Sequence, residues 1–153
     1  MMVCAFIETE KERLRVKKRL INLLQVHFEA IKTKKTEAHI TKALERAWLY
    51  DSTAKFIGLY HENNLVGFCF FNIGFGISAG GPYVWLNDIF VQKAYRRKGG
   101  ANALLKYLVQ WVNAKQYGYI AAIADKNNVA SQQLFKSNSF DIDQNIVWMD
   151  RGG

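Results

Sequence analysis

The sequence contains little proline and cysteine, and it has no long apolar run. One proline and 11 glycines among 153 residues exclude a collagen-like or proline-rich chain. No apolar stretch approaches the roughly 18 residues that a membrane-spanning helix needs, so we expect no association with a membrane. The N-terminus lacks the basic segment, long apolar stretch and small-residue cleavage site of a secretory signal. We therefore expect a cytoplasmic protein.

The two cysteines indicate neither a metal site nor a disulfide framework. Cys4 and Cys69 stand in apolar stretches, without Cys-x-x-Cys or Cys/His spacing. We therefore expect two buried, reduced thiols and no metal cofactor.

Apolar and aromatic residues are abundant. Hydrophobic residues make up 50% of the chain and aromatic residues 14%, which is enough to build a core and too much for a disordered chain. A chain of 153 residues is the size of one ordinary domain. We expect residues 1–153 to form a single domain.

The net charge of +8 would suit an anionic partner, such as a phosphorylated cofactor or a nucleic acid. Much of the excess lies within residues 1–50 on a helical stretch, where a solvated helix face is the simpler explanation. No RRM, helix-turn-helix or zinc-finger spacing accompanies the charge, so we do not expect nucleic acid as the partner. The basic triplet 96–98 differs, because it runs directly into glycines.

Hydrophobic periodicity predicts alternating groups of strands and helices. The predicted helices are 10–29, 36–50, 99–116 and 128–138, with Asp51 and Ser52 ending the second. The predicted strands are 3–8, 55–60, 65–73, 83–91 and 119–124, followed by a closing pair within 140–149. The order β-α-α-β-β-β-α-β-α-β-β predicts an α/β (α+β) fold with a mixed, mostly antiparallel sheet and helices on both faces.

The strand 83–91 leads through a basic turn into a helix that begins with the small residues 99–101. The first turn of a helix leaves backbone N–H groups without intrahelical partners, and the macrodipole adds positive charge there. Small residues let a pyrophosphate approach these amides, and the triplet 96–98 would add charge. Because glycines also serve plain turns, the pattern by itself leaves anion binding and an ordinary turn open.

Two motifs in this region resemble a known family. The string Arg96-Arg97-Lys98-Gly99-Gly100-Ala101 resembles the Q/R-x-x-G-x-G/A signature of the GNAT superfamily of N-acetyltransferases, and its flanks VQKAYRRKGGANALL are similar to V-x-x-x-Y-R-x-x-G-x-G/A-x-x-L-L. Residues 128–140, NVASQQLFKSNSF, resemble the N-x-x-A-x-x-L-Y-x-x-x-G-F pattern of that family. WLNDIFV at 85–91 looks most similar to Y-L-E-D-F-F-V of the diamine (spermidine/spermine) acetyltransferase branch.

The resemblance implies a GNAT-like fold that binds acetyl-CoA as co-substrate. The fourth and fifth strands would part at a bulge, so that pantetheine pairs with exposed backbone. The amides of 97–102 would hold the pyrophosphate, and an amide near residue 90 or 91 would stabilise the oxyanion. The implied cofactor-binding residues are Ile89, Phe90, Val91, Arg96, Arg97, Lys98, Gly99, Gly100, Ala101, Asn102, Asn128, Ser131 and Phe135.

Two departures from the family pattern affect the expected mechanism. Asn87 stands where the diamine branch has its glutamate base, and Phe135 stands where many GNAT enzymes have a tyrosine acid. Neither side chain can exchange a proton. Deprotonating an alkyl amine at pH 7 costs about 4–5 kcal/mol, whereas releasing a thiolate costs about 2 kcal/mol. Losing the base should therefore affect the rate more than losing the acid.

Three residues are candidates to replace the missing base. Strand alternation places Asp88 on the opposite face from Asn87, which favours a structural role unless a bulge reverses its direction. His61 lies in a predicted turn, where a solvated histidine is the simpler interpretation. Glu29 resembles the substrate-side acid of the diamine branch. The candidate catalytic residues are Asn87, Asp88 and Val91, and the candidate substrate-binding residues are Glu29 and Asn87.

We expect an N-acetyltransferase that transfers acetyl from acetyl-CoA directly to a primary amine of a small, polyamine-like molecule. Direct transfer is expected because neither cysteine lies in the strand-turn-helix segment. The alternative is a CoA-binding GNAT-like module with little or no turnover that acts in regulation or interaction. A homodimer is a further expectation, because pairing through the last strands is common in similar proteins.

Overall fold

The computed structural model describes residues 1–50 and 53–152, so the predicted helix end at Asp51 and Ser52 lies outside the described residues. The chain forms two compact units, Met1–Ile123 and Ala124–Gly153. Within the described residues, no helix combines the length and the apolar character needed to cross a bilayer.

The first unit contains a five-stranded sheet in the order β1-β2-β3-β4-β5. Its strands are β1 (Met2–Phe6), β2 (Ala54–His61), β3 (Asn64–Gly76), β4 (Gly81–Val91) and β5 (Ile120–Ala122). The pairs from β1 to β4 are antiparallel, and β5 is parallel to β4. This is the predicted mixed, mostly antiparallel sheet.

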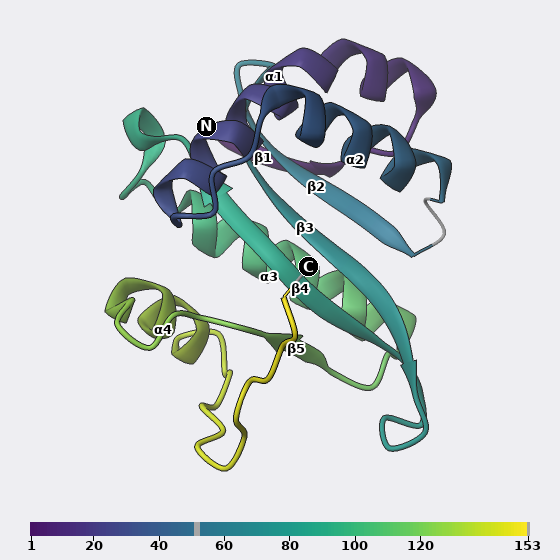
Figure 1. The fold of residues 1–153 in the computed structure, drawn as a ribbon, viewed down its shortest axis with the longest axis vertical. Helices are drawn as coiled ribbons and strands as arrows, with labels where there is room; N and C mark the ends of the chain where they lie inside the picture. Colours follow the sequence, from purple (N-terminus) through teal and green to yellow (C-terminus); the bar gives the residue numbers. More distant parts are fainter. Residues whose placement is uncertain (51–52, 153) are drawn as a thin grey trace. The chain divides into compact units, whose positions relative to one another are not determined.

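Three helices cover this sheet: α1 (Glu10–Ala30), α2 (Glu37–Leu49) and α3 (Gly100–Lys115). The hydroxyls of Thr9 and Thr36 cap the first two helices by accepting from the amides of Glu12 and His39, each at 3.1 Å. Helices α1 and α2 lie over one face of the sheet and α3 over the other (Figure 1). The prediction of helices on both faces is confirmed.

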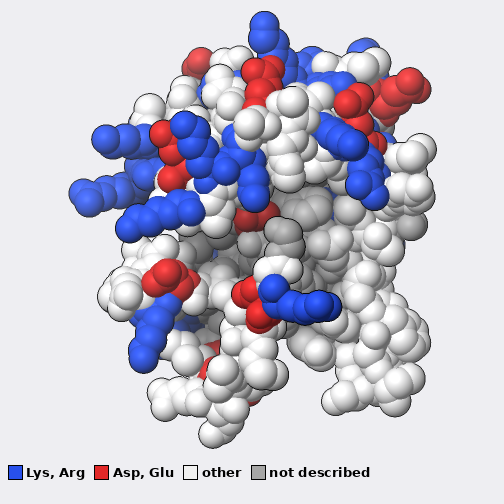
Figure 2. All heavy atoms as spheres, viewed as in Figure 1, with Lys and Arg blue, Asp and Glu red and all other residues white. Residues whose placement is uncertain are grey.

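Aromatic residues fill the core on both faces of the sheet. Phe56, Phe68 and Phe90 pack with buried leucines of α1 and α2. On the other face, the ring centroid of Phe71 lies 5.5 Å from that of Trp111 in α3. Figure 2 shows that lysines and arginines gather in the upper part of the view, over α1 and α2, which agrees with a solvated basic helix face.

The second unit contains α4 (Val129–Lys136), in place of the predicted helix 128–138. The closing pair of strands predicted within 140–149 does not form: residues 141–150 are exposed and adopt no strand. Aspartate side chains make local hydrogen bonds here, for example from Asn145 N to Asp143 Oδ1 at 2.9 Å and from Trp148 Nε1 to Asp150 Oδ2 at 3.2 Å. A strand needs a paired neighbour, and aspartate side chains that bind nearby backbone favour turns instead.

Candidate active site

Asn87 is the extra residue of a β-bulge in β4. Phe70 of β3 lies opposite Asp88, while the next residue, Phe71, lies opposite Leu86. Between these two pairs β4 therefore advances by two residues while β3 advances by one. Such a bulge bends the strand that carries the extra residue.

The bulge separates the neighbours of Asn87 onto the two faces of the sheet. Residues directly opposite each other in an antiparallel pair share a face. Phe71 packs against Trp111 of α3, so its partner Leu86 faces α3. Phe70 packs against the core beneath α1 and α2, so its partner Asp88 faces those helices.

Asn87 lies on the same face as Asp88. Its Oδ1 accepts a hydrogen bond from Asn72 Nδ2 at 2.8 Å, and Asn72 is two residues from Phe70 on β3. In the alternative amide orientation, in which Asn87 Oδ1 no longer faces Asn72, Nδ2 donates to Trp85 O and Oδ1 accepts from Trp85 Nε1, each at 3.2 Å. The alternation expected from the sequence therefore fails here, because the bulge turns both side chains to the α1 side.

Asp88 pairs with a histidine of α1. The Nε2 atom of His27 lies 3.0 Å from Asp88 Oδ1, and the two side chains are 8% and 17% exposed. The rings of Phe28, Phe68 and Phe90 surround the imidazole, with centroids at 5.4, 5.9 and 5.4 Å. In such apolar surroundings a hydrogen bond is stronger than in water.

The ladder between β4 and β5 ends at the bulge. β5 pairs only with Val84, Trp85 and Leu86, whereas β4 continues to Val91. The open edge of β4 consists of residues 87–91, for which β5 supplies no partner. This is the separation of strands that the resemblance implied.

The register decides which backbone groups face the open edge. Gln92 donates its amide to Val66 O of β3 at 2.8 Å. Because hydrogen-bonded residues alternate along an antiparallel ladder, Phe90 turns its backbone toward β3, while Ile89 and Val91 turn theirs toward the open edge. The amide of Val91, rather than that of Phe90, is therefore the candidate oxyanion donor.

The basic turn after β4 is held by its own side chains. Arg96 donates Nε to Val91 O at 2.8 Å, so this arginine closes the turn onto the strand. Lys98 lies over the ring of Tyr95, with Nζ 5.7 Å from the centroid. Arg97 is exposed and has a φ of 62°, a left-handed conformation that costs a non-glycine residue about 1–2 kcal/mol.

Helix α3 begins directly after this turn. Ala103 donates its amide to Gly99 O at 2.9 Å. The amides of Gly100 and Ala101 precede that bond at the positive end of the helix dipole, and Asn102 lies half-buried in the same turn.

The two glycines have different local roles. Gly99 has a φ of 79°, and a Cβ there would meet nothing within 4 Å. Gly100 is buried, and its Cβ would lie 2.7 Å from Leu59 Cδ2. Gly99 therefore leaves open space beside the helix terminus, whereas Gly100 lets α3 approach the sheet.

His61 and Glu29 do not share the surroundings of Asp88. His61 is the last residue of β2 and does not lie in the predicted turn. On β2, the residue level with Asp88 is Phe56, because both lie opposite Phe70 of β3, and His61 is five residues further along the strand. That separation is about 16 Å along the strand. Glu29 is exposed, and a spacing of two helical residues turns it about 200° away from His27.

The remaining predicted cofactor residues belong to the second unit. Asn128 caps α4, because its Oδ1 accepts from the amide of Ser131 at 3.0 Å. Phe135 is buried, and its ring centroid lies 5.1 Å from that of Phe140. Their assignment to cofactor binding stays a prediction.

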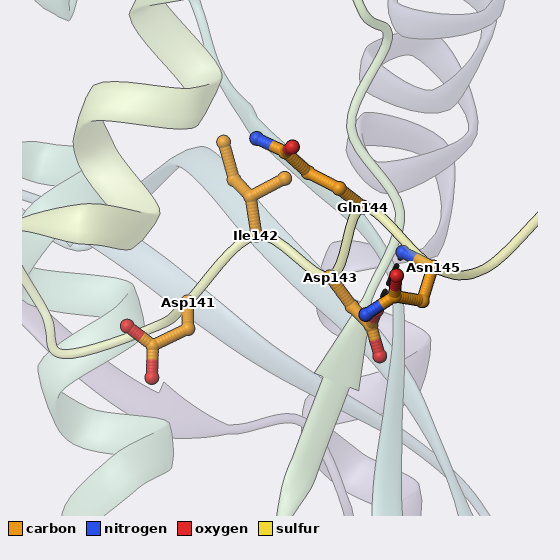
Figure 3. Close-up of a pocket in the computed structure, with 5 residues that line it drawn as sticks. All are labelled: Asp141, Ile142, Asp143, Gln144 and Asn145. Carbon is orange, nitrogen blue, oxygen red and sulfur yellow. Dashed lines mark hydrogen bonds between the residues drawn. The ribbon is translucent and has the colours of Figure 1, made fainter.

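A shallow hollow in the second unit carries none of the predicted site residues. Residues 141–145 line it, and all five belong to one exposed segment (Figure 3). The dashed contact is the bond from Asn145 N to Asp143 Oδ1. Within residues 1–50 and 53–152, no group of three or more His, Cys, Asp or Glu side chains is arranged to hold a metal ion.

The sequence interpretation did not identify His27. A signal existed, because His27 follows Leu20, Leu23 and Leu24 at the helical spacing of the buried stripe of α1. A polar residue within such a stripe needs a buried partner. The sequence did not indicate that the partner would be Asp88.

A model of the acetyltransferase (GNAT) family matches residues 18–140. A search of curated proteins gives no significant match. Among solved structures, the ribosomal-protein-alanine N-acetyltransferase from Brucella melitensis biovar Abortus 2308 is 20% identical, with 99% of this chain and 100% of that chain covered and a TM-score of 0.77.

Two aminoglycoside-modifying proteins have a similar fold. The aminoglycoside N-acetyltransferase AAC(6')-Iy, solved in complex with CoA, is 18% identical, with 99% of this chain and 95% of that chain covered and a TM-score of 0.78. An aminoglycoside acetyltransferase from an uncultured soil metagenomic sample, solved with sisomicin, is 17% identical, with coverages of 99% and 95% and a TM-score of 0.76. At these identities the likeness shows the fold alone. Because the family match spans most of the sequence, the chain belongs to the acetyltransferase (GNAT) family.

Proposed function

We propose that this protein transfers the acetyl group of acetyl-CoA directly to a primary amine of a small molecule, with residues 1–153 acting as one catalytic domain. The observation that carries the proposal is the continuity between the open edge of β4 and the N-terminus of α3. This arrangement offers unpaired strand backbone and helix-terminal amides on one continuous segment.

The residues along this segment fit acetyl-CoA. The open space beside Gly99 and the amides of Gly100 and Ala101 suit a diphosphate. The backbone of Ile89 and the amide of Val91 face the edge where pantetheine would pair. Bound acetyl-CoA supplies a thioester carbonyl that an amine can attack.

The predicted residues of the segment from β4 to α3 have distinct tasks in this proposal. The amide of Val91 stabilises charge on the carbonyl oxygen, and Arg97 adds positive charge near the diphosphate. Arg96 and Lys98 shape the turn through Val91 and Tyr95. In the second unit, Asn128 caps α4 through Oδ1, and the sequence motif alone supports the proposal that Asn128, Ser131 and Phe135 bind the cofactor.

Cys69 is buried as expected, whereas Cys4 is half-buried instead of buried, and the environment of both thiols supports direct transfer without an acyl-enzyme. Burial raises the pKa of Cys4 to about 11. Cys69 lies opposite Ile89 and is 0% exposed, and burial raises its pKa further. A thiol needs its thiolate form to attack, so neither cysteine is prepared as a nucleophile.

The acceptor is proposed from the motif alone. The likeness of WLNDIFV to the diamine branch supports a polyamine-like amine. Asn87 and Asp88 are the proposed acceptor-side residues at the bulge, whereas a role for the exposed Glu29 in acceptor binding stays a prediction from the sequence. We also propose a homodimer. The apolar residues 146–149 are 62–84% exposed, and a second copy of the chain could cover them.

Two measurements test the proposal. CoA and acetyl-CoA should raise the unfolding midpoint, because a ligand that binds only the native state stabilises it. Pantetheine, which lacks the diphosphate, should stabilise less than CoA. Thiol release in the presence of acetyl-CoA and a panel of amines then identifies the acceptor.

The alternative is a CoA-binding module with little turnover, which Asn87 and Phe135 favour because neither can exchange a proton. CoA stabilisation without thiol release on any amine or peptide would support this alternative. No stabilisation at millimolar CoA would contradict both functions.

A further inference from the structure

We propose that His27 is a positioning residue that holds Asp88 as the proton acceptor for the amine, an inference that rests on the proposed acetyl transfer. Asp88 stands at the bulge beside the open edge of β4. His27 reaches it from α1, 61 residues earlier in the chain. The pair supplies the proton-exchanging group that Asn87 cannot supply.

His27 has a fixed orientation. The residue is 7% exposed, and three phenylalanine rings surround its imidazole. Phenylalanine side chains carry no nitrogen or oxygen that could accept a hydrogen bond from the imidazole. The 3.0 Å contact with Asp88 Oδ1 therefore sets the direction of His27 Nε2. In turn, the donor Nε2–H holds the carboxylate in place. Leaving a partly buried carboxylate without its hydrogen-bond partner would cost free energy.

The second carboxylate oxygen is left for the substrate. The structure gives Asp88 one side-chain hydrogen bond, the bond to His27. Asp88 Oδ2 is not among the buried polar atoms without a partner in the described residues, so solvent reaches it. Asp88 is also the more exposed member of the pair, at 17% against 8% for the side chain of His27. An ammonium group can therefore contact Oδ2 while Oδ1 stays bound.

The proposed step balances in protons and electrons. The ammonium gives one proton to Asp88 Oδ2, and the freed lone pair forms the bond from nitrogen to the acetyl carbonyl carbon. The carbon–sulfur bond breaks, sulfur keeps the electron pair, and the second nitrogen proton ends on sulfur. Asp88 returns its proton to water, so the products are an amide, a thiol and one released proton. A positioned carboxylate gives the proton a route out of the site.

Substitutions at both positions test these roles through kinetics. Asp88→Asn keeps the shape and should lower kcat by about 100-fold or more, while CoA still raises the unfolding midpoint. His27→Leu removes the donor and should lower kcat/KM by about 10- to 100-fold, because small displacements of a catalytic group are costly. His27→Gln keeps an N–H donor and should recover most of this loss. His39→Leu, on the exposed face of α2, is the matched control and should leave the rate unchanged.

A readout independent of activity examines the hydrogen bond itself. In ¹⁵N NMR spectra of the whole protein, the Nε2 proton of His27 should be visible and slow to exchange. Asp88→Ala should make it exchange faster, whereas His39→Leu should not. A wild-type protein without a protected Nε2 proton would overturn the proposal.

The outcomes separate this inference from the proposed function. Wild-type acetyl transfer that His27→Leu leaves intact, or that His27→Gln fails to rescue, overturns the role of His27 and leaves the acetyltransferase function standing. CoA binding without turnover on any amine overturns the proposed function and, with it, the catalytic role of the pair. The NMR result then reports only a structural hydrogen bond.

Discussion

Leu86 and Asp88 face opposite sides of the sheet although only Asn87 separates them. In a regular strand, residues two apart share a face. The inserted residue lets Leu86 join the core under α3 while Asp88 meets His27 of α1. The β4–β5 ladder ends at the same insertion. One bulge therefore both turns the carboxylate of Asp88 toward α1 and marks the start of the open edge.

Deleting Asn87 should therefore affect the open edge more than the carboxylate. Leu86 and Asp88 would become adjacent and keep their faces by ordinary alternation, so the bond to His27 should survive. The straighter strand should let β5 pair beyond Leu86, and the CoA-induced rise in unfolding midpoint should shrink. Thermal unfolding with and without CoA measures this. Asn87→Ala, which keeps the bulge, is the control, and an equal CoA response in the deletion variant would contradict the role of the bulge.

Gly99→Ala and Gly100→Ala should both lower the free energy of unfolding, but they should differ in their effect on CoA binding. Gly100→Ala places a methyl 2.7 Å from the buried Leu59 and should lower the free energy of unfolding by about 1–3 kcal/mol. Gly99→Ala strains a residue at a φ of 79° and should cost about 1–2 kcal/mol. Only Gly99→Ala puts its methyl into the open space proposed for the diphosphate. It should therefore reduce the stabilisation by CoA more than Gly100→Ala, as urea unfolding with and without CoA would show.

The cysteines should be dispensable for transfer. Because burial raises the pKa of Cys4 to about 11, its thiol should react with iodoacetamide at pH 7.5 at least about tenfold more slowly than free cysteine. The double variant Cys4→Ser/Cys69→Ala should keep its thiol-release activity once folding is verified by circular dichroism. An acetylated cysteine that forms and decays at the rate of turnover would instead establish an acyl-enzyme.

Glu12 should stabilise the fold in a pH-dependent way. The hydrogen bond from Arg15, followed by that from Tyr60, holds the pKa of Glu12 below its ordinary value. A lowered folded-state pKa contributes stability above the unfolded value of about 4.3, and this contribution is lost as pH falls through the folded value. Glu12→Gln should lower the free energy of unfolding at pH 7 by at most about 1 kcal/mol, since the pair is exposed.

Urea unfolding at pH 7, 5 and 3 checks this dependence. The gap between wild type and Glu12→Gln should be present at pH 7 and 5 and should close toward pH 3. Glu10→Gln, in the same helical turn, is the matched control. A gap of equal size at pH 3 would show that Glu12 acts through packing and not through its charge.

The segment from β4 to α3 was predictable because its information is local. Strand, basic turn, glycines and helix follow one another within residues 83–116, and the structure forms them as β4 and α3. The pair of strands expected within 140–149 was not predictable in the same way, since alternation indicates only that a segment can pair. Whether it pairs depends on a neighbour that the segment does not contain.

The sequence by itself determined the helices, the four principal strands and the family signature, because each depends on residues close together in the chain. Tertiary structure alone decided that His27 meets Asp88, that Val91 rather than Phe90 turns its amide outward, and that Arg96 binds the carbonyl of Val91. These features depend on the register of β3 against β4 and on the packing of α1 over the bulge. One extra residue in a strand changes which face the following side chains occupy. The sequence of that strand does not show where its partner strand will pair with it.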